Sequence, residues 1–159
     1  DMLTAFSYIK SNDGVTLASQ YPYETNDTFE CQPIHPIANI AAFKHIEGIS
    51  EDLLKKYLIK YGPIAIAIDA SLASFQTYKS GIYYDPGCSK NVNHAMVLVG
   101  YGTVTYTNKA TKKKTQQDYW LLRNTYGELW GEDGYMRLAR NRDNHCGITD
   151  FAVVVKCLK

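Results

Sequence analysis

The histidine in the segment NVNHAMVLVGYG, His94, is the residue of this sequence best placed for acid–base chemistry. It leads an apolar run, residues 96–99, that is typical of a buried strand, and a rigid strand fixes an imidazole in space. An imidazole exchanges its proton near neutral pH, so a fixed histidine can serve as a general base. A general base needs a nucleophile to activate, yet no serine or cysteine of the chain is an obvious candidate. Taken alone, a histidine in this context is more often structural than catalytic.

A catalytic histidine also needs a neighbour that holds its ring in one tautomer. Asn124 ends the strand-like run DYWLLRN, and its amide can accept the imidazole N–H without adding a charge. The residues that follow predict a tight turn packed under aromatic rings: Gly127, Trp130, Gly131 and Gly134. As pure structure, this segment is a glycine–aromatic hairpin. The remaining histidines are less suggestive, because His35 and His45 lie in surface-like sequence and His145 adjoins Cys146.

Length and charge exclude several classes of protein. The 159 residues suffice for one domain with a real core. A net charge of +1 argues against nucleic acid or a membrane surface as the main partner. No apolar run reaches the roughly 18 residues of a membrane span. An amphipathic helix is predicted over residues 2–11, so we expect sequence before Asp1 that processing, cleavage or truncation removed, although a compact domain can also start on a helix.

The chain has four cysteines, Cys31, Cys88, Cys146 and Cys157, and none of them forms a CxxC pair. This spacing does not predict a zinc site. An even number of cysteines outside metal spacing favours disulfides and an oxidising compartment, but spacing alone does not choose among the three pairings. Asn26 opens an Asn-Asp-Thr glycosylation sequon, which also fits a secretory route.

The periodicity of apolar residues predicts a β-rich protein. A helix with Ser50 as its N-cap is expected to end near Tyr61, before Gly62-Pro63, and a short helix or turn follows residue 70. Strand-like runs lie near residues 40–46, 64–69, 81–85, 95–102, 118–124, 134–140 and 151–156. No helices alternate with these runs, which favours an antiparallel barrel or curled sheet over a doubly wound parallel sheet. Residues 107–117 are expected to be a solvated basic loop, or else a site for an acidic partner.

Three segments occur in the order VNHAMVLVGYG, YWLLRNTYGELWGEDGY and NHCGI, and they resemble the C-terminal half of papain-like cysteine peptidases. The segment AFSYIKSNDGVTLASQYPY resembles the stretch just after the Gly-Gly turn of that family. GPIAIAIDASLASFQTYKSGIYYDPGCS resembles its cathepsin L branch, and the similarity covers essentially the whole chain. The resemblance implies an α+β fold, with residues 1–35 as a remnant of the helical left lobe and residues 36–159 as the β-rich right lobe.

The resemblance also implies roles for the two candidate residues. His94 would be the catalytic base and later the general acid, and Asn124 would orient it. The family uses a cysteine nucleophile with an oxyanion-hole glutamine just before it, and neither has a match in this chain. Since the histidine and asparagine lie roughly 130–150 residues after that cysteine, the nucleophile would lie about 35 to 55 residues before Asp1. The implied mechanism is thiolate attack, an acyl-enzyme and hydrolysis, with no cofactor or metal.

The same resemblance implies a disulfide between Cys88 and Cys146, which makes Cys88 a poor nucleophile. Cys31 matches a cysteine whose partner lies upstream, in the absent segment. Cys157 matches nothing in the family pattern, so it could pair with Cys31 or with another chain.

One departure from the family pattern concerns the residues after the asparagine. The family usually has Asn-Ser-Trp, whereas this chain has Asn124-Thr125-Tyr126. The tryptophan shields the asparagine–histidine hydrogen bond from water. Tyr126, with Trp130 as the second supporting aromatic residue, is expected to do so only partly, because its ring is smaller and its hydroxyl seeks a partner.

A second departure concerns the pocket for the side chain two residues before the scissile bond. Matching residue by residue assigns its walls to Met2, Ala67, Val92 and Asn93, and its floor to Phe151. That floor is commonly a small residue in the cathepsin L branch. A phenylalanine would shorten the pocket and favour smaller apolar side chains, unless Phe151 is simply a core residue.

The leading interpretation is part of a cathepsin L-like endopeptidase, lysosomal or secreted, that is inactive without an N-terminal segment or chain carrying the cysteine. Its expected partners are that segment, peptide or protein substrates, and propeptide or cystatin-type inhibitors. The alternative is a catalytically inactive homologue that binds proteins or peptides or serves as a structural component. An unrelated β-rich binding domain would require His94 and Asn124 to lie far apart.

Overall fold

The computed structural model describes residues 1–23, 32 and 34–158. The sequon at Asn26 and the pairing of Cys31 lie outside these residues. The chain divides into two compact units, the first made of Asp1–Lys44 with Val155–Lys159 and the second of His45–Val154.

The first unit opens with helix α1, Met2–Ser11, which confirms the predicted helix. Asp1 caps this helix, because its carboxylate accepts hydrogen bonds from the first free N–H groups. The chain then turns at Gly14, whose φ is +125° and where a Cβ would collide with the carbonyl oxygen of Ala38. Helix α1 contains no buried residue, and its apolar face is only partly covered: Met2, Leu3, Phe6 and Ile9.

The second unit contains helix α2, Glu51–Tyr61, and both of its ends follow the local sequence signals. The Ser50 hydroxyl accepts a hydrogen bond from the Leu53 N–H at 3.2 Å, which is an N-cap. Gly62 ends the helix with a φ of +82°. The face of α2 that packs into the core is formed by Leu54 and Leu58.

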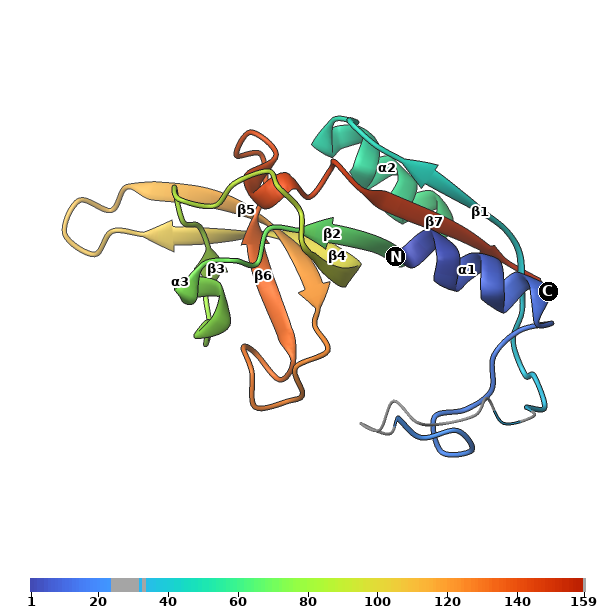
Figure 1. Cartoon of the computed structure of the whole chain (residues 1–159). Helices are drawn as coiled ribbons and strands as arrows, with labels where there is room; N and C mark the ends of the chain where they lie inside the picture. The colour runs from blue at the N-terminus through green and yellow to red at the C-terminus, as the bar shows by residue number, and fades with distance from the viewer. Residues whose placement is uncertain (24–31, 33, 159) are drawn as a thin grey trace. The chain divides into compact units, whose positions relative to one another are not determined.

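Seven strands form one sheet in the order β1-β7-β2-β4-β5-β6-β3 (Figure 1). Their bounds are Ile40–Ile46 (β1), Ile64–Ile68 (β2), Ile82–Tyr83 (β3), His94–Thr107 (β4), Lys114–Arg123 (β5), Tyr135–Ala139 (β6) and Ala152–Cys157 (β7). Two short helical segments complete the described structure, α3 (Ala73–Gln76) and η1 (His145–Gly147). The pairs β2–β4, β2–β7, β4–β5 and β5–β6 are antiparallel, as predicted, but β3 pairs with β6 in parallel. The α+β class is confirmed.

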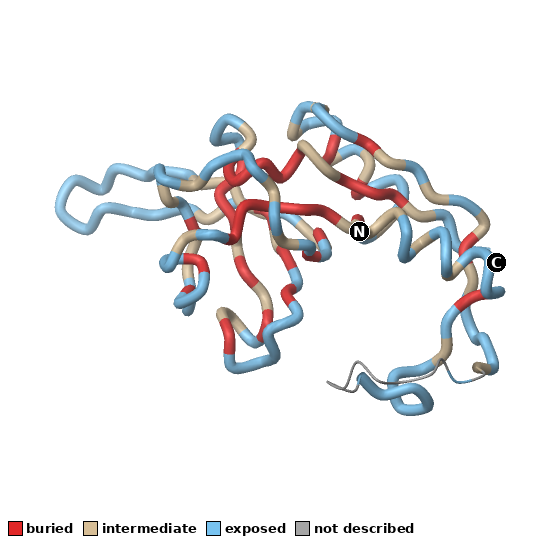
Figure 2. Tube along the Cα trace, in the orientation of Figure 1, coloured by how far each residue is buried: buried red, intermediate tan, exposed pale blue. Residues whose placement is uncertain are grey.

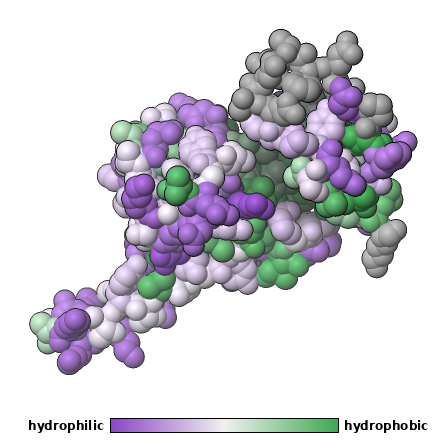
Figure 3. Space-filling view, turned by 90° about the horizontal axis from the view of Figure 1, so that it is seen from below, coloured by the Kyte–Doolittle hydropathy of each residue, from purple (hydrophilic) through white to green (hydrophobic). Residues whose placement is uncertain are grey.

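Strands β4 and β5 form a long hairpin that extends beyond the core (Figure 1). Its strands remain paired out to Thr107 and Lys114, so the predicted loop over residues 107–117 is wrong in extent. Only residues 108–113 connect the strands, because threonine and glutamine are tolerated in a strand that faces solvent on both sides. The outer part of the hairpin is exposed in Figure 2 and mainly hydrophilic in Figure 3.

The core of the second unit lies on strands β2, β4, β5 and β6, which carry the fully buried stretches in Figure 2. Trp120 of β5 is its largest fully buried side chain, and its indole Nε1–H donates to the Glu51 carboxylate at 2.8 Å. Burying an apolar side chain of this kind stabilises the fold by roughly 1.5–3 kcal/mol. The remaining large members with no exposed surface include Ile64, Ile66, Ile68, Leu98, Leu122, Met136 and Leu138. Among the described residues, no helix is long and apolar enough to cross a membrane.

Leucines in the core and on the surface should differ sharply when they are truncated. Leu98 has no exposed surface, whereas Leu129 is 95% exposed. We expect Leu98→Ala to lower the free energy of unfolding by about 2–5 kcal/mol, because it leaves a cavity, and Leu129→Ala to change it by less than about 0.5 kcal/mol. Urea titration followed by tryptophan fluorescence measures both. Equal effects of the two substitutions would contradict the placement of this core.

Candidate active site

The structure brings His94 and Asn124 into direct contact. His94 is the first residue of β4 and pairs with Ile68 at the end of β2. Asn124 follows Arg123, the last residue of β5, and its backbone N–H donates to the Gly134 carbonyl at 2.9 Å. The His94 Nε2 and the Asn124 Oδ1 are 2.9 Å apart, and Asn124 is buried. Two neighbouring strands therefore hold the imidazole and the amide against one another.

The surroundings of the amide fix the tautomer of the imidazole. The Thr125 N–H also points at the Asn124 Oδ1, at 2.8 Å, and a backbone N–H can only donate. The atom between Thr125 and His94 is therefore the amide oxygen, which only accepts. The His94 Nε2 must then carry the hydrogen, which leaves Nδ1 of the neutral ring as an acceptor. A ring held in this way can take a proton at Nδ1 without losing its orientation.

Aromatic rings surround the His94 imidazole. The ring centroids of Tyr126 and Phe75 lie 5.1 and 5.8 Å from that of His94. Trp130 packs behind them, 5.2 Å from Phe75 and 5.7 Å from Tyr126. Phe75 has no exposed surface, whereas Tyr126 remains 43% exposed. Tyr126 therefore covers the imidazole from one side while facing water itself.

The three cysteines that the structure describes fall into two environments. Cys88 and Cys146 form a disulfide with their Cα atoms 5.1 Å apart, the pairing that the family resemblance implied. Cys157 is free and exposed. The side chains of Cys88, His145 and Cys146 lie within 4.8 Å of one another, a spacing that could hold a metal ion. Because the disulfide occupies both sulfurs, this group offers no thiolate ligands.

The residues assigned to the substrate pocket are divided between the two compact units. In the second unit, the Ala67 N–H donates to the Phe151 carbonyl at 3.0 Å, and the Asn93 N–H donates to the Ile68 carbonyl at 2.9 Å. Val92 directly precedes Asn93 in the segment that leads to His94. Met2, in contrast, opens α1 in the first unit.

His45 is not in surface-like surroundings, which corrects the sequence-based interpretation. It lies in β1, is only partly exposed, and packs against Phe151 in a tilted arrangement with ring centroids 4.3 Å apart. Its Nε2 is buried with no hydrogen-bond partner among the described residues. The sequence missed this because Lys44 directly precedes His45 and Glu47 lies two positions after it, whereas alternate residues of a strand face opposite sides.

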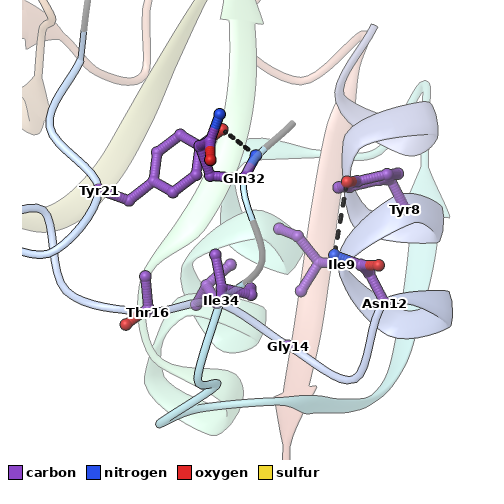
Figure 4. A pocket seen from close by; sticks show the side chains of 9 residues that line it. Tyr8, Ile9, Asn12, Gly14, Thr16, Tyr21, Gln32 and Ile34 are labelled. Atoms are coloured by element: carbon purple, nitrogen blue, oxygen red, sulfur yellow. Dashed lines mark hydrogen bonds between the residues drawn. The ribbon is translucent and has the colours of Figure 1, made fainter. Parts of the chain in front are cut away.

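A separate cavity of about 340 Å³ lies in the first unit, beside α1 (Figure 4). Residues of α1, residues 14–16, Tyr21, Gln32 and Ile34 line it. The Gln32 N–H donates to the Tyr21 hydroxyl at 3.2 Å, as Figure 4 shows.

Two residues near His94 were not singled out in the sequence. Phe75 packs on the imidazole from the short helix α3, and Asp69 is buried directly after β2. A signal for Asp69 was present, because an acidic residue continues the alternating run IAIAID. No pattern in the sequence pointed from Phe75 to His94, since 19 positions separate them (94 minus 75).

Comparison with known proteins identifies the family of this chain. The profile of the family described as "Papain family cysteine protease" matches residues 1–156. The chain is 44% identical over 150 residues to a "Cathepsin L-like peptidase" of Aedes aegypti, which is 93% of this chain and 42% of that protein. It is 42% identical over 154 residues to "Cathepsin K" of Mus musculus, which is 95% of this chain and 44% of that protein. The chain thus spans less than half the length of these relatives.

Solved structures give the same result. The digestive procathepsin L2 proteinase from Tenebrio molitor larval midgut superposes with a TM-score of 0.79 at 37% identity, over 96% of this chain and 45% of that chain. The bromelain protease from Ananas comosus, solved in complex with the E64 inhibitor, superposes with a TM-score of 0.78 at 33% identity, over 96% of this chain and 67% of that chain. Both likenesses cover almost all of the present chain, and they confirm the papain-like α+β fold.

The His94–Asn124 hydrogen bond should be visible by NMR. We expect the His94 Nε2–H proton to exchange slowly with water and to give a resolved imidazole signal, assigned by its loss in His94→Gln. Asn124→Leu keeps a similar volume but removes the acceptor, so the signal should disappear. Asn91→Leu, at an exposed asparagine nearby, is the matched control and should leave the signal in place. A persistent signal in Asn124→Leu would show that the amide does not hold the ring.

Stability should fall at mildly acidic pH because of His145. Burial lowers the pKa of His145 below its ordinary value of 6.5, although the charges of Asp85 and Glu51 oppose this shift. The unfolded chain therefore takes up a proton below about pH 6.5 that the folded chain resists, so stability declines as the pH falls from there. In urea titrations at pH 7.5 and 5.5, His145→Gln should reduce this decline, and His35→Gln, at an exposed site, should not. An identical pH slope in His145→Gln would refute the assignment.

Proposed function

The chain belongs to the papain family of cysteine proteases, and on that premise we propose that it carries the histidine–asparagine half of a cathepsin L-like peptidase site. His94 is the proton-transfer residue and Asn124 is the residue that orients it. The observation that carries the proposal is the 2.9 Å contact between His94 Nε2 and Asn124 Oδ1, with Nδ1 left as the acceptor. In this division of the chain, residues 1–35 are a remnant of the helical lobe and residues 36–159 form the β-rich lobe.

The proposed reaction is the hydrolysis of peptide bonds through a cysteine thiolate. The thiolate forms an ion pair with the His94 imidazolium, protonated at Nδ1. It attacks the carbonyl carbon of the substrate, and the C–N bond breaks as His94 passes its Nδ1 proton to the leaving amine. The product is a thioester. His94 then takes a proton from water, the resulting hydroxide attacks the thioester, and the acid product and the thiolate are released. Asn124 holds the ring through both transfers.

The nucleophilic cysteine belongs to a segment or chain other than the one described. Cys88 and Cys146 are joined to one another, so neither is a nucleophile for His94. The apolar face of helix α1 has no buried residue. An apolar helix face normally packs against another element, which supports the proposal of a further segment. The isolated chain is therefore expected to be inactive, and the N-terminal portion of the same peptidase is its obligatory partner.

Substrates are peptides or proteins that place a small apolar side chain two residues before the scissile bond. In this proposal Ala67, Val92 and Asn93 form walls of this pocket, and Phe151 forms its floor. The tight contact of Phe151 with His45 supports a rigid floor. Propeptide and cystatin-type inhibitors occupy the same groove. The Cys88–Cys146 disulfide supports a lysosomal or secreted location, because disulfides persist in oxidising compartments.

The exposure of Tyr126 favours a second candidate, a papain-like homologue that binds peptides or proteins, or serves a structural role, without cleaving them. A tyrosine that is 43% exposed leaves the His94–Asn124 hydrogen bond closer to water than a larger indole would. In this second candidate function, the groove binds a peptide or protein, but proton transfer by His94 is too slow for turnover.

Hydrolysis of a fluorogenic peptide by the full-length protein that contains this chain tests the proposal. His94→Ala should lower kcat by roughly 10²–10⁴-fold, because general acid–base catalysis is lost. Asn124→Ala should have a smaller effect in the same direction. The matched control is His35→Ala, at an exposed histidine, which should keep the wild-type rate.

A thiol-directed epoxide probe separates the two candidate functions. Labelling of the full-length protein but not of the isolated chain supports the peptidase. An absence of both labelling and hydrolysis in the full-length protein, with retained peptide binding, would favour the non-catalytic homologue. Hydrolysis by the isolated chain that is abolished by Cys88→Ser would overturn the need for a separate nucleophile.

A further inference from the structure

A buried carboxylate, that of Asp69, lies at the end of the strand that pairs with His94. Asp69 directly follows β2 and is only 2% exposed. Its backbone N–H donates to the Cys146 carbonyl at 2.9 Å, which fixes the main chain at this point. Ionisable side chains are rarely buried to this degree unless they are paired with an opposite charge or hydrogen-bonded.

Among the residues that the structure describes, the polar contacts of this carboxylate are with hydrogen-bond donors. Its Oδ1 accepts from the Ser71 N–H at 2.9 Å and from the Asn93 Nδ2 at 3.1 Å. Its Oδ2 accepts from the Ser89 N–H at 2.8 Å and from the Ser89 Oγ at 2.7 Å. An ionised carboxylate accepts at both oxygens, whereas an amide of the same shape would turn an NH₂ group toward one of these donors. The site therefore selects an aspartate and rejects an asparagine.

The ionised form is favoured by the same contacts. Burial by itself raises the pKa of Asp69, but the hydrogen bonds from Ser71 and Ser89 outweigh it and hold the pKa well below its usual range. The carboxylate consequently stays charged in mildly acidic surroundings.

These contacts tie Asp69 to the segment that leads into His94, residues 88–93. The Ser89 Oγ also accepts from the Asn91 N–H at 3.1 Å, so one hydroxyl links the carboxylate to the next turn of the segment. The Asn93 Oδ1 accepts from the Ala70 N–H at 2.9 Å while its Nδ2 donates to Asp69. Asn93 is thus held by both ends of its amide and by its own N–H, and His94 is the next residue.

Besides the Asp69 carboxylate, the disulfide at Cys88 and the hydrogen bonds of Asn93 with the main chain of Ile68 and Ala70 restrain this segment. The disulfide to Cys146 fixes its start at Cys88. The ion pair of Lys90 with Asp143 is exposed on both sides, and pairs of that kind contribute little. Between the disulfide and β4, the Asp69 carboxylate is the group that holds both Ser89 and Asn93.

We propose that Asp69 is a positioning residue for the active site: its carboxylate fixes residues 88–93 and thereby sets the location of the His94 imidazole and of the wall residues Val92 and Asn93. The catalytic consequence rests on the function proposed above, whereas the positioning of His94 does not. Displacing a proton-transfer group by about 1 Å can cost up to roughly 10²-fold in rate. The role is distinct from those of His94 and Asn124, because Asp69 acts through the backbone of the segment.

Asp69→Asn tests the proposal, with Asp143→Asn as the matched control. Both substitutions remove one negative charge, but Asp143 is an exposed partner of Lys90 with a side chain that is 96% exposed. In the isolated chain, Asp69→Asn should shift or broaden the slowly exchanging His94 Nε2–H signal and leave the Trp120 indole signal in place. In the full-length protein it should lower kcat by roughly 10-fold to 10²-fold at a temperature far below its unfolding transition. Asp143→Asn should change neither.

Ser89→Ala keeps the test decisive if Asp69→Asn does not fold. It removes one donor and should shift the same His94 signal by a smaller amount. A merely structural role would lower the unfolding temperature of folded Asp69→Asn but leave its His94 signal and kcat unchanged, and that result would overturn the proposal. If the full-length wild-type protein hydrolyses nothing, the peptidase function fails, while the NMR comparison in the isolated chain still decides the role of Asp69.

Discussion

Strand β4 pairs with β2 on one side and β5 on the other, and the candidate site depends on both registers. His94 is set by the pairing of β4 with Ile68, and Asn124 is set by the pairing of Arg123 with Val97. A slip of one residue in either ladder would turn the side chain to the opposite face of the sheet. The 2.9 Å contact between imidazole and amide is therefore a consequence of the whole sheet. The apolar side chains of β2, β4 and β5 that have no exposed surface fix both registers.

Loops around this sheet are held by carboxylates that accept several hydrogen bonds each. Glu51, at the start of α2, accepts from the Trp120 indole and from the N–H groups of Asn141 and Asn144. Asp69 plays the same part for residues 88–93. Backbone N–H groups in irregular segments need acceptors, and one carboxylate can satisfy two or three of them. Glu51 thus helps to position the segment that precedes Cys146, and Asp69 helps to position the segment that follows Cys88.

The surroundings of His94 are dry on one side and wet on the other. Phe75 and Trp130 are buried and exclude water from the inner face of the aromatic cluster, while Tyr126 forms its outer edge. Trp130 is kept in place by the hydrogen bond from its Nε1 to the Gln76 carbonyl. Protection of the imidazole–amide contact therefore depends on α3 as well as on the turn after Asn124.

The sequence by itself determined what depends on near neighbours. The N-cap at Ser50 and the stop at Gly62 delimit α2, because capping acts within one turn. The alternation of apolar residues located the strands, and the three ordered motifs identified the family. Only the tertiary structure decided the partners of residues distant in the chain. It buried His45 against Phe151, placed β3 parallel to β6, and gave Asp69 a donor 24 residues away. Periodicity reports which face of an element is apolar, but it carries no information on which distant group will meet that face.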